Sequence, residues 1–256
     1  MEYSRRPLAL ITGGSRGIGA ATALALADCG YDVTLTYRNK ATRASEVAAE
    51  VMQRGVRALT ICCDITQQMD IELLFAELRE WRGQLDLLVL NAAGGLERDL
   101  VAADPDYPMR INRDAQLTVL DGALPLMSEG GVVVFVTSHL AHVPGHFDYV
   151  PAYTPIAKSK YAGEQALRAR QQELMNKGIR IIVVTGDLIE GTIMSRLIER
   201  IAPGFPEERR QRAGKLPTVT DMASAIANAA MDTSLPSGHT VVVGGSLDTV
   251  IRHGNA

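Results

Sequence analysis

Short runs rich in Val, Ile and Leu alternate along the whole chain with stretches whose apolar residues have helical spacing. The runs cover 8–12, 32–37, 58–64, 85–91, 131–138, 179–186 and 239–245, and the helical stretches cover 18–29, 42–54, 69–81, 112–127, 157–177 and 220–231. The runs show little polar alternation, which is typical of strands covered by helices on both faces. This order predicts an α/β fold with a doubly wound, seven-stranded parallel sheet.

The stretch 192–219 interrupts the alternation with two helix-like pieces, TIMSRLIERIA and PEERRQRAG, which meet around Pro203, Gly204 and Pro206. No linker or composition shift divides the rest of the chain, so we expect a single domain over 1–256 with 192–219 as a helical insertion. An insertion of this kind is typical of a lid that covers a substrate cleft. A hairpin of surface helices is the alternative.

The composition excludes several classes of protein. The 256 residues include 26 basic and 29 acidic ones, for a formal net charge of −3, which argues against nucleic acid as a partner because phosphate binding needs clustered Lys and Arg. No apolar run approaches the roughly 18 residues of a membrane-spanning helix. The three cysteines, Cys29, Cys62 and Cys63, have no zinc-binding spacing. We therefore expect reduced thiols in a cytoplasmic protein without a membrane partner.

Three histidines, His139, His142 and His146, follow the fifth run at spacings that one helical face could share. Pro144 and Gly145 interrupt such a helix, so we expect no metal site. The histidines are expected in a loop near the mouth of the cleft. A proton relay through one of them is the alternative, since a histidine titrates near neutral pH.

The segment TGGSRGIG, at 12–19, directly follows the first predicted strand and opens the first predicted helix. Gly13, Gly17 and Gly19 allow a tight turn, close approach of a pyrophosphate and close packing of the helix on the sheet. The helix N-terminus adds amide donors and partial positive charge. A glycine loop alone is a weak signal, but strand, loop and helix together predict dinucleotide binding. A purely structural glycine turn is the alternative.

The choice of dinucleotide depends on the end of the second predicted strand, where a carboxylate favours NAD and an arginine favours NADP. Arg38 stands at that end, whereas Asp32 stands at the beginning of the strand. Arg16 in the glycine loop adds a second guanidinium, which fits a phosphate well. These residues predict NADPH as the cofactor. NAD, with two solvated arginines, is the alternative.

Taken together, these motifs resemble those of the short-chain dehydrogenase/reductase family over nearly the whole chain. The markers are TGGSRGIG, Asp64 after the third strand, the NAAG box at 91–94, Asn112, Ser138 and VVVGG near the C-terminus. The resemblance implies a Rossmann fold, and it implies that Asp64 contacts adenine and that Thr192 lies near the nicotinamide carboxamide. The implied cofactor-binding residues are Gly13, Ser15, Arg16, Gly17, Ile18, Gly19, Arg38, Asp64, Ile65, Asn91, Ala92, Gly94, Lys160, Gly186 and Thr192.

The chain departs from that family in the catalytic motif. Family members carry Tyr-x-x-x-Lys, in which the tyrosine protonates the carbonyl oxygen and the lysine binds the nicotinamide ribose and lowers the phenol pKa. No tyrosine here has a lysine four residues later. Alignment of the segment GEQALRARQQEL with the family places Lys160 at the lysine position, and Ile156 then stands at the tyrosine position.

Two hypotheses account for the missing tyrosine. In the first, Tyr153 brings its hydroxyl into the cleft from three residues before Ile156. In the second, which we favour on the sequence alone, no protein phenol donates a proton, and a substrate phenol hydrogen-bonded to the ketone supplies it. The candidate catalytic residues are Ser138, Lys160, Asn112 and Tyr153.

The sequence therefore predicts an NADPH-dependent oxidoreductase that reduces a ring ketone of an aromatic polyketide, such as an angucyclinone in antibiotic biosynthesis. A catalytically inactive, NADP(H)-sensing binding protein is the alternative. A dehydratase or epimerase on the same scaffold is a third possibility. Because relatives of this family are commonly dimers or tetramers, we expect a homo-oligomer whose other partner is a small aromatic ketone.

Overall fold

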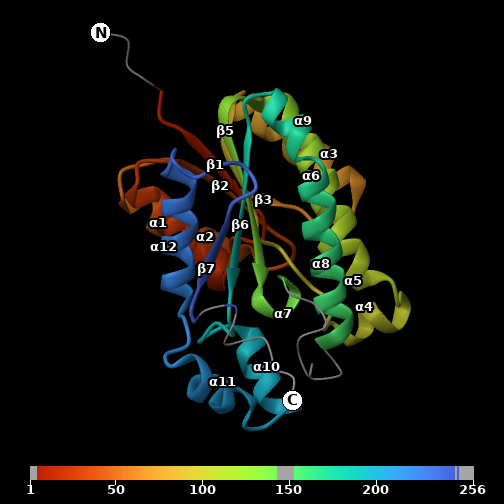
Figure 1. The fold of residues 1–256 in the computed structure, drawn as a ribbon. Helices are drawn as coiled ribbons and strands as arrows, with labels where there is room; N and C mark the ends of the chain where they lie inside the picture. Colours follow the sequence, from red (N-terminus) through yellow and green to blue (C-terminus); the bar gives the residue numbers. More distant parts are fainter. Residues whose placement is uncertain (1–4, 143–152, 246, 248–256) are drawn as a thin grey trace.

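The computed structural model describes residues 5–142, 153–245 and 247, and it contains one parallel sheet (Figure 1). The seven strands have the order β3-β2-β1-β4-β5-β6-β7, and every neighbouring pair is parallel. They are β1 Leu8–Ile11, β2 Asp32–Tyr37, β3 Ala58–Cys62, β4 Leu85–Leu90, β5 Met127–Ser138, β6 Arg180–Gly186 and β7 Thr240–Val243. The predicted doubly wound α/β sheet is confirmed.

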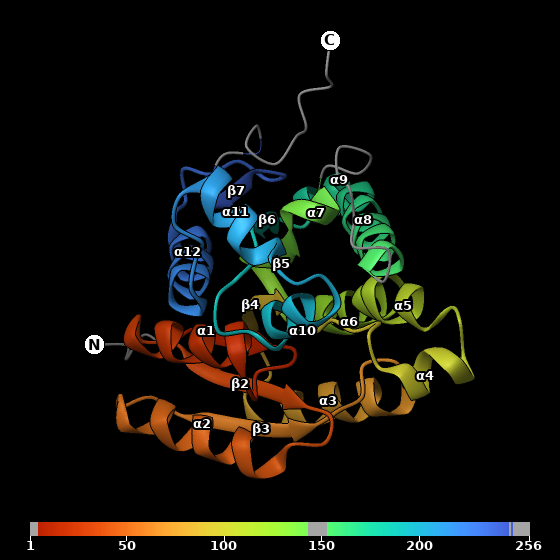
Figure 2. The same ribbon diagram turned by 90° about the horizontal axis from the view of Figure 1, so that it is seen from below.

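Helices cover both faces of this sheet. The longer helices are α1 Gly17–Asp28, α2 Ala41–Gln53, α3 Gln68–Trp81, α6 Ala115–Ala123, α8 Thr154–Ala169, α10 Ile193–Ile201, α11 Phe205–Ala213 and α12 Val219–Met231. The short helical segments are α4 Arg98–Ala103, α5 Tyr107–Met109, the π-helical turn η1 Arg110–Asp114, the 3₁₀ turn η2 Leu124–Leu126, α7 His139–His142 and α9 Gln171–Asn176. Helices α1, α2 and α12 lie on one face, and α3, α6 and α8 lie on the other (Figures 1 and 2).

Each face of the sheet has its own apolar core, because successive strand residues point to opposite faces. Leu8 and Leu10 of β1 belong to the core under α3, α6 and α8, whereas Ala9 and Ile11 belong to the core under α1, α2 and α12. All four residues are fully buried. Burial on both faces explains why the strand runs lack polar alternation.

The order of the strands determines where a site can form. Strand β1 pairs with β2 on one side and with β4 on the other, so the crossovers diverge at this point of the sheet. In open α/β sheets the ligand crevice lies outside the carboxyl ends of the strands at such a switch point. The glycine loop after β1 and the NAAG box after β4 therefore meet there.

The predicted helical insertion forms α10 and α11, which lie at the carboxyl end of the sheet (Figure 2). Arg209 of α11 forms a buried ion pair with Asp187, the residue that follows β6, at 2.6 Å. Ile198 of α10 packs in a cluster with Leu188 and Leu216. The insertion is thus attached to the domain by both charge and apolar contacts. Among the described residues, no helix is both long and apolar enough to cross a bilayer.

Candidate active site

The glycine loop between β1 and α1 has the geometry that its sequence predicts. Gly13 and Gly17 have positive φ angles of +69° and +56°. A Cβ on Gly14 would lie 2.5 Å from the Leu35 Cβ, and a Cβ on Gly19 would overlap the Gly13 carbonyl. A Cβ on Gly17, by contrast, would point into open space. The loop is tightly packed against the sheet and leaves room on its outer side for a ligand.

Hydrogen bonds join this loop to the end of β4. The Thr12 hydroxyl oxygen accepts from the backbone N–H groups of Asn91 and Ala92, both at 3.0 Å. The Asn91 amide donates to the Thr12 carbonyl at 2.9 Å. The Thr36 hydroxyl of β2 accepts from the Gly13 N–H at 3.1 Å. Three strands thereby fix the loop, which is the preorganisation that a phosphate-binding loop requires.

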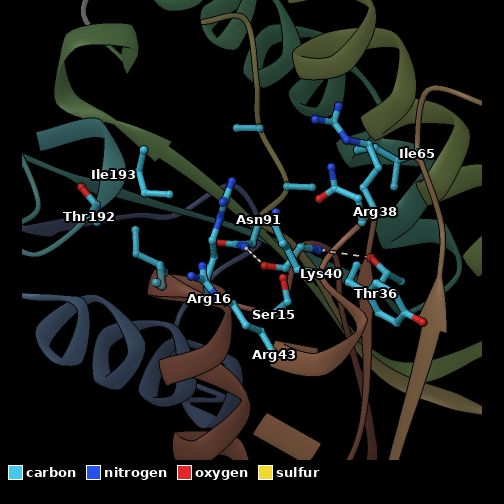
Figure 3. A pocket seen from close by; sticks show the side chains of 18 of the residues that line it. Ser15, Arg16, Thr36, Arg38, Lys40, Arg43, Ile65, Asn91, Thr192 and Ile193 are labelled. Atoms are coloured by element: carbon cyan, nitrogen blue, oxygen red, sulfur yellow. Dashed lines mark hydrogen bonds between the residues drawn. The ribbon is translucent and has the colours of Figure 1, made fainter. Parts of the chain in front are cut away.

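A cleft of about 440 Å³ runs along these strand ends, within the range of cofactor pockets. Figure 3 shows Arg38 and Ile65 on one side, Thr192 on the other, and Asn91 between them. Most of the predicted cofactor residues line this cleft, namely Gly13, Ser15, Arg16, Gly17, Ile18, Gly19, Arg38, Asp64, Ile65, Asn91, Ala92 and Thr192. Gly94 and Lys160 line an adjoining cavity. Gly186 lies at the end of β6 against Met222 and lines neither.

The cleft carries several cationic side chains. Arg16, Arg38, Lys40 and Arg43 all line it (Figure 3). Lys40 and Arg43 were not among the predicted residues, although both closely follow Arg38 in the sequence. Asp32 lies at the opposite end of β2, fully buried, and pairs with Arg82 at 2.6 Å. The residues present fit a dinucleotide that carries an additional phosphate near Arg38.

Asn112 lies in the π-helical turn η1 and supports the site from behind. Its amide nitrogen donates to the Gly94 carbonyl and to the Ser159 hydroxyl, both at 2.9 Å. Its side-chain oxygen accepts from the Gly94 N–H at 3.2 Å. Gly163 packs so closely on the Asn112 carbonyl that a Cβ would overlap it. Asn112 thus fixes both the NAAG box and α8.

The adjoining cavity brings together the candidate catalytic side chains Ser138, Tyr153 and Lys160, with Ile156 between the last two in the sequence. The Ser138 and Tyr153 hydroxyl oxygens lie 3.2 Å apart and share a hydrogen bond. Tyr153 is 4% exposed, and its ring packs with Ile156 and Ala157. The Tyr153 hydroxyl thus reaches Ser138, which is the arrangement that the first of the two hypotheses describes.

This outcome has a simple geometric cause. Tyr153 is the N-cap residue of α8, one helical turn before Ile156. Its ring is long enough to bring the hydroxyl back to the end of β5. Lys160, two turns later, is half-buried, and desolvation lowers the pKa of its ammonium group to about 8.

The described histidines have structural partners. His139 is fully buried; its ring nitrogens contact the Gly244 carbonyl at 2.9 Å and the Thr185 hydroxyl at 3.2 Å, and burial lowers its pKa. His142 pairs with the buried Glu164 at 2.8 Å. The expectation that these two lie in a loop at the cleft mouth is wrong, because both form the short helix α7. His146 lies outside the described residues. Within the described part of the chain, no cluster of three or more His, Cys, Asp or Glu could hold a metal ion.

Comparison with known proteins identifies related chains. The family model for short chain dehydrogenase matches residues 7–201. The 1-cyclohexenylcarbonyl-CoA reductase of Streptomyces collinus is 31% identical over 96% of this chain and 88% of its own. The hydroxynaphthalene reductase arp2 of Aspergillus fumigatus is 32% identical over 77% of this chain and 71% of its own. The structure of the angucycline C-6 ketoreductase LanV with bound NADP superposes with a TM-score of 0.77 at 27% identity, over 92% of this chain and 93% of its own.

Proposed function

Because the chain belongs to the short-chain dehydrogenase family, we propose that it is an NADPH-dependent ketoreductase that acts on a ring ketone of a hydroxylated aromatic polyketide of the angucyclinone type. The observation that carries this proposal is the contact between the Ser138 and Tyr153 hydroxyls, in a cavity next to the cleft that most of the predicted cofactor residues line. A protein that only sensed the cofactor would not need two hydroxyl groups in contact in this cavity.

The residues of the cleft divide the cofactor between them. The glycine loop, with Ser15 and Ile18, would hold the pyrophosphate, and Arg16 and Arg38 would hold the 2′-phosphate. Asp64 and Ile65 would contact the adenine, and the NAAG box would line the centre of the cleft. Lys160 would bind the nicotinamide ribose, and Thr192 would contact the carboxamide. When bound, NADPH supplies the hydride that adds to the carbonyl carbon.

The proton for the carbonyl oxygen has two candidate sources. Tyr153 is placed to donate its hydroxyl proton while Ser138 donates a hydrogen bond to the same oxygen, and the phenolate then recovers a proton from solvent. A substrate phenol next to the ketone is the other source, and it needs no protein acid. The 3.2 Å contact between Tyr153 and Ser138 favours the protein phenol.

The cavity walls support an aromatic ketone as substrate. Besides the catalytic side chains, the walls carry Leu140, Ile156, Met194 and Ile198, so most of the contact offered to a substrate is apolar. Such surfaces bind flat apolar rings, and a few polar groups fix their orientation. The two related reductases named for hydroxynaphthalene and angucycline substrates support the same class.

A matched pair of substrates tests the proposal. One is an aryl ketone with a neighbouring phenol, and the other is its O-methyl ether, which cannot donate a proton; the loss of NADPH absorbance is followed with each. We expect wild type to reduce both, and Tyr153→Phe to lose about 10²–10⁴-fold in kcat on both. If wild type reduces only the free phenol and Tyr153→Phe is unaffected, the substrate is the acid.

Other outcomes would reject the reductase itself. Binding of NADPH without consumption across a panel of such ketones would indicate a cofactor sensor. Formation of product without net consumption of NADPH would indicate a dehydratase or an epimerase.

Ser138→Ala should lower kcat with both ketones, because it removes a hydroxyl donor to the carbonyl oxygen.

We also propose that the chain acts in the cytoplasm as a homo-oligomer. The free thiols Cys29, Cys62 and Cys63 support a reducing compartment. Sedimentation of the purified protein at several concentrations would give the number of subunits, and a monomer at all concentrations would contradict the proposal.

A further inference from the structure

Arg38, the arginine at the end of β2, is held by a residue far away in the sequence. Its Nη1 group donates to the Tyr107 hydroxyl oxygen at 2.9 Å. Its Nη2 group lies 3.7 Å from a Glu97 carboxylate oxygen, which is too long for a hydrogen bond. Among the described residues, Tyr107 is thus the side chain that accepts a hydrogen bond from the guanidinium group, while Glu97 adds the longer ion pair.

Tyr107 is itself rigidly placed. It begins the short helix α5 and is 5% exposed, and its ring is part of the core under α3 and α6. Burial, together with the nearby Glu97, raises the pKa of its hydroxyl, so the phenol stays neutral near a bound phosphate. The Glu97 carboxylate is also fixed, because it accepts from the Gly95 and Leu96 N–H groups at 2.7 and 3.1 Å.

A rigid hydrogen-bond acceptor changes what an arginine can contribute to binding. A free arginine side chain loses conformational entropy when a ligand orders it. An arginine already held in place over the cleft loses less of this entropy when it binds. We propose that Tyr107 is a positioning residue that sets the preference for a 2′-phosphorylated cofactor by holding Arg38 over the adenosine end of the cleft. This inference rests on the cofactor choice in the proposed function.

The test compares the dissociation constants of NADPH and NADH by quenching of protein fluorescence, without any ketone. We expect Tyr107→Phe to weaken NADPH binding roughly tenfold, because a hydrogen bond to a charged group is lost. Binding of NADH should change less than about twofold, since NADH has no 2′-phosphate. Tyr31→Phe, which changes a part-buried tyrosine outside the cleft, serves as the matched control and should leave both constants unchanged.

An Arg38→Ala background shows whether Tyr107 acts through Arg38. In that background Tyr107→Phe should not alter the NADPH-to-NADH ratio further. If Tyr107→Phe weakens the binding of NADPH and NADH equally, or leaves both dissociation constants unchanged, the inference is overturned and the proposed reductase stays intact. If wild type itself binds NADPH no better than NADH, the inference and the proposed cofactor both fail, whereas ketone reduction is judged separately by the absorbance assay.

Discussion

The buried ion pair between Asp187 and Arg209 yields a quantitative prediction about how the helical insertion is attached. The two side chains are 2% and 4% exposed, and they share two hydrogen bonds, at 2.6 and 3.1 Å. The Asp187 carboxylate also accepts from the Leu188 N–H at 2.7 Å. Asp187→Asn keeps the shape of the side chain but removes the negative charge that Asp187 places beside the guanidinium group of Arg209.

The expected cost follows from the burial of both groups. Loss of one charge of a buried ion pair destabilises a protein by about 3–5 kcal/mol, because the desolvation of the other charge is then less well compensated. For a chain of this size that corresponds to a decrease in Tm of roughly 6–20 °C. Glu190→Gln, which breaks the exposed pair with Arg210, should cost no more than about 1 kcal/mol.

Urea denaturation followed by circular dichroism measures these free energies of unfolding. The double variant Asp187→Leu with Arg209→Met should recover most of the loss, because apolar residues of similar volume replace buried pairs at little cost. If Asp187→Asn costs less than about 1 kcal/mol, the pair is not the buried attachment inferred here. The single variants Asp187→Leu and Arg209→Met are measured as well. If the double variant loses as much free energy of unfolding as the two single variants together, the two groups act independently, and the reasoning is refuted.

Three further predictions concern the site itself. Gly19→Ala should abolish NADPH binding while the chain stays folded, since the new methyl group displaces the glycine loop; calorimetric titration with circular dichroism tests this. Gly163→Ala should destabilise the protein by about 1–3 kcal/mol in urea, because its Cβ overlaps the Asn112 carbonyl. Burial lowers the pKa of Lys160 to about 8, so its ammonium charge is present below that pH and lost above it. The Kd for NADPH should therefore rise as the pH increases through about 8, and Lys160→Met should abolish this step.

The alternation of strands and helices and the glycine loop could be predicted because both follow from local sequence. Buried strands appear as unbroken apolar runs, and the glycine loop carries its own backbone requirements at Gly13 and Gly17. The boundaries were less accurate. Strand β5 begins at Met127 rather than at 131, and its register with β4 is irregular at this start. The helix expected over 112–127 instead consists of the turn η1, helix α6 and the short turn η2.

The contacts that could not be predicted join residues far apart in the chain. His139 bonds to groups at 185 and 244, Arg209 to Asp187, and Arg38 to Tyr107, which is 69 residues away. Periodicity and motifs describe one segment at a time and contain no information on such pairs. Arg38 lines the cleft, but nothing in its own segment indicates that a tyrosine of helix α5 holds it.

The chain lacks the Tyr-x-x-x-Lys motif, yet the Tyr153 hydroxyl still reaches the Ser138 hydroxyl. Proton transfer depends on where the hydroxyl oxygen lies, and Ser138 marks that place with a contact of 3.2 Å. The Cα of a residue at position 153 lies about 4.5 Å along the helix axis from that of a residue at position 156. The tyrosine side chain is long enough to cover a distance of this size. Lys160 then follows two turns later rather than one, with Ile156 between the two levels. We therefore propose that the shift lengthens the interval between Tyr153 and Lys160 but keeps the contact with Ser138, and that Lys160 acts chiefly on the cofactor.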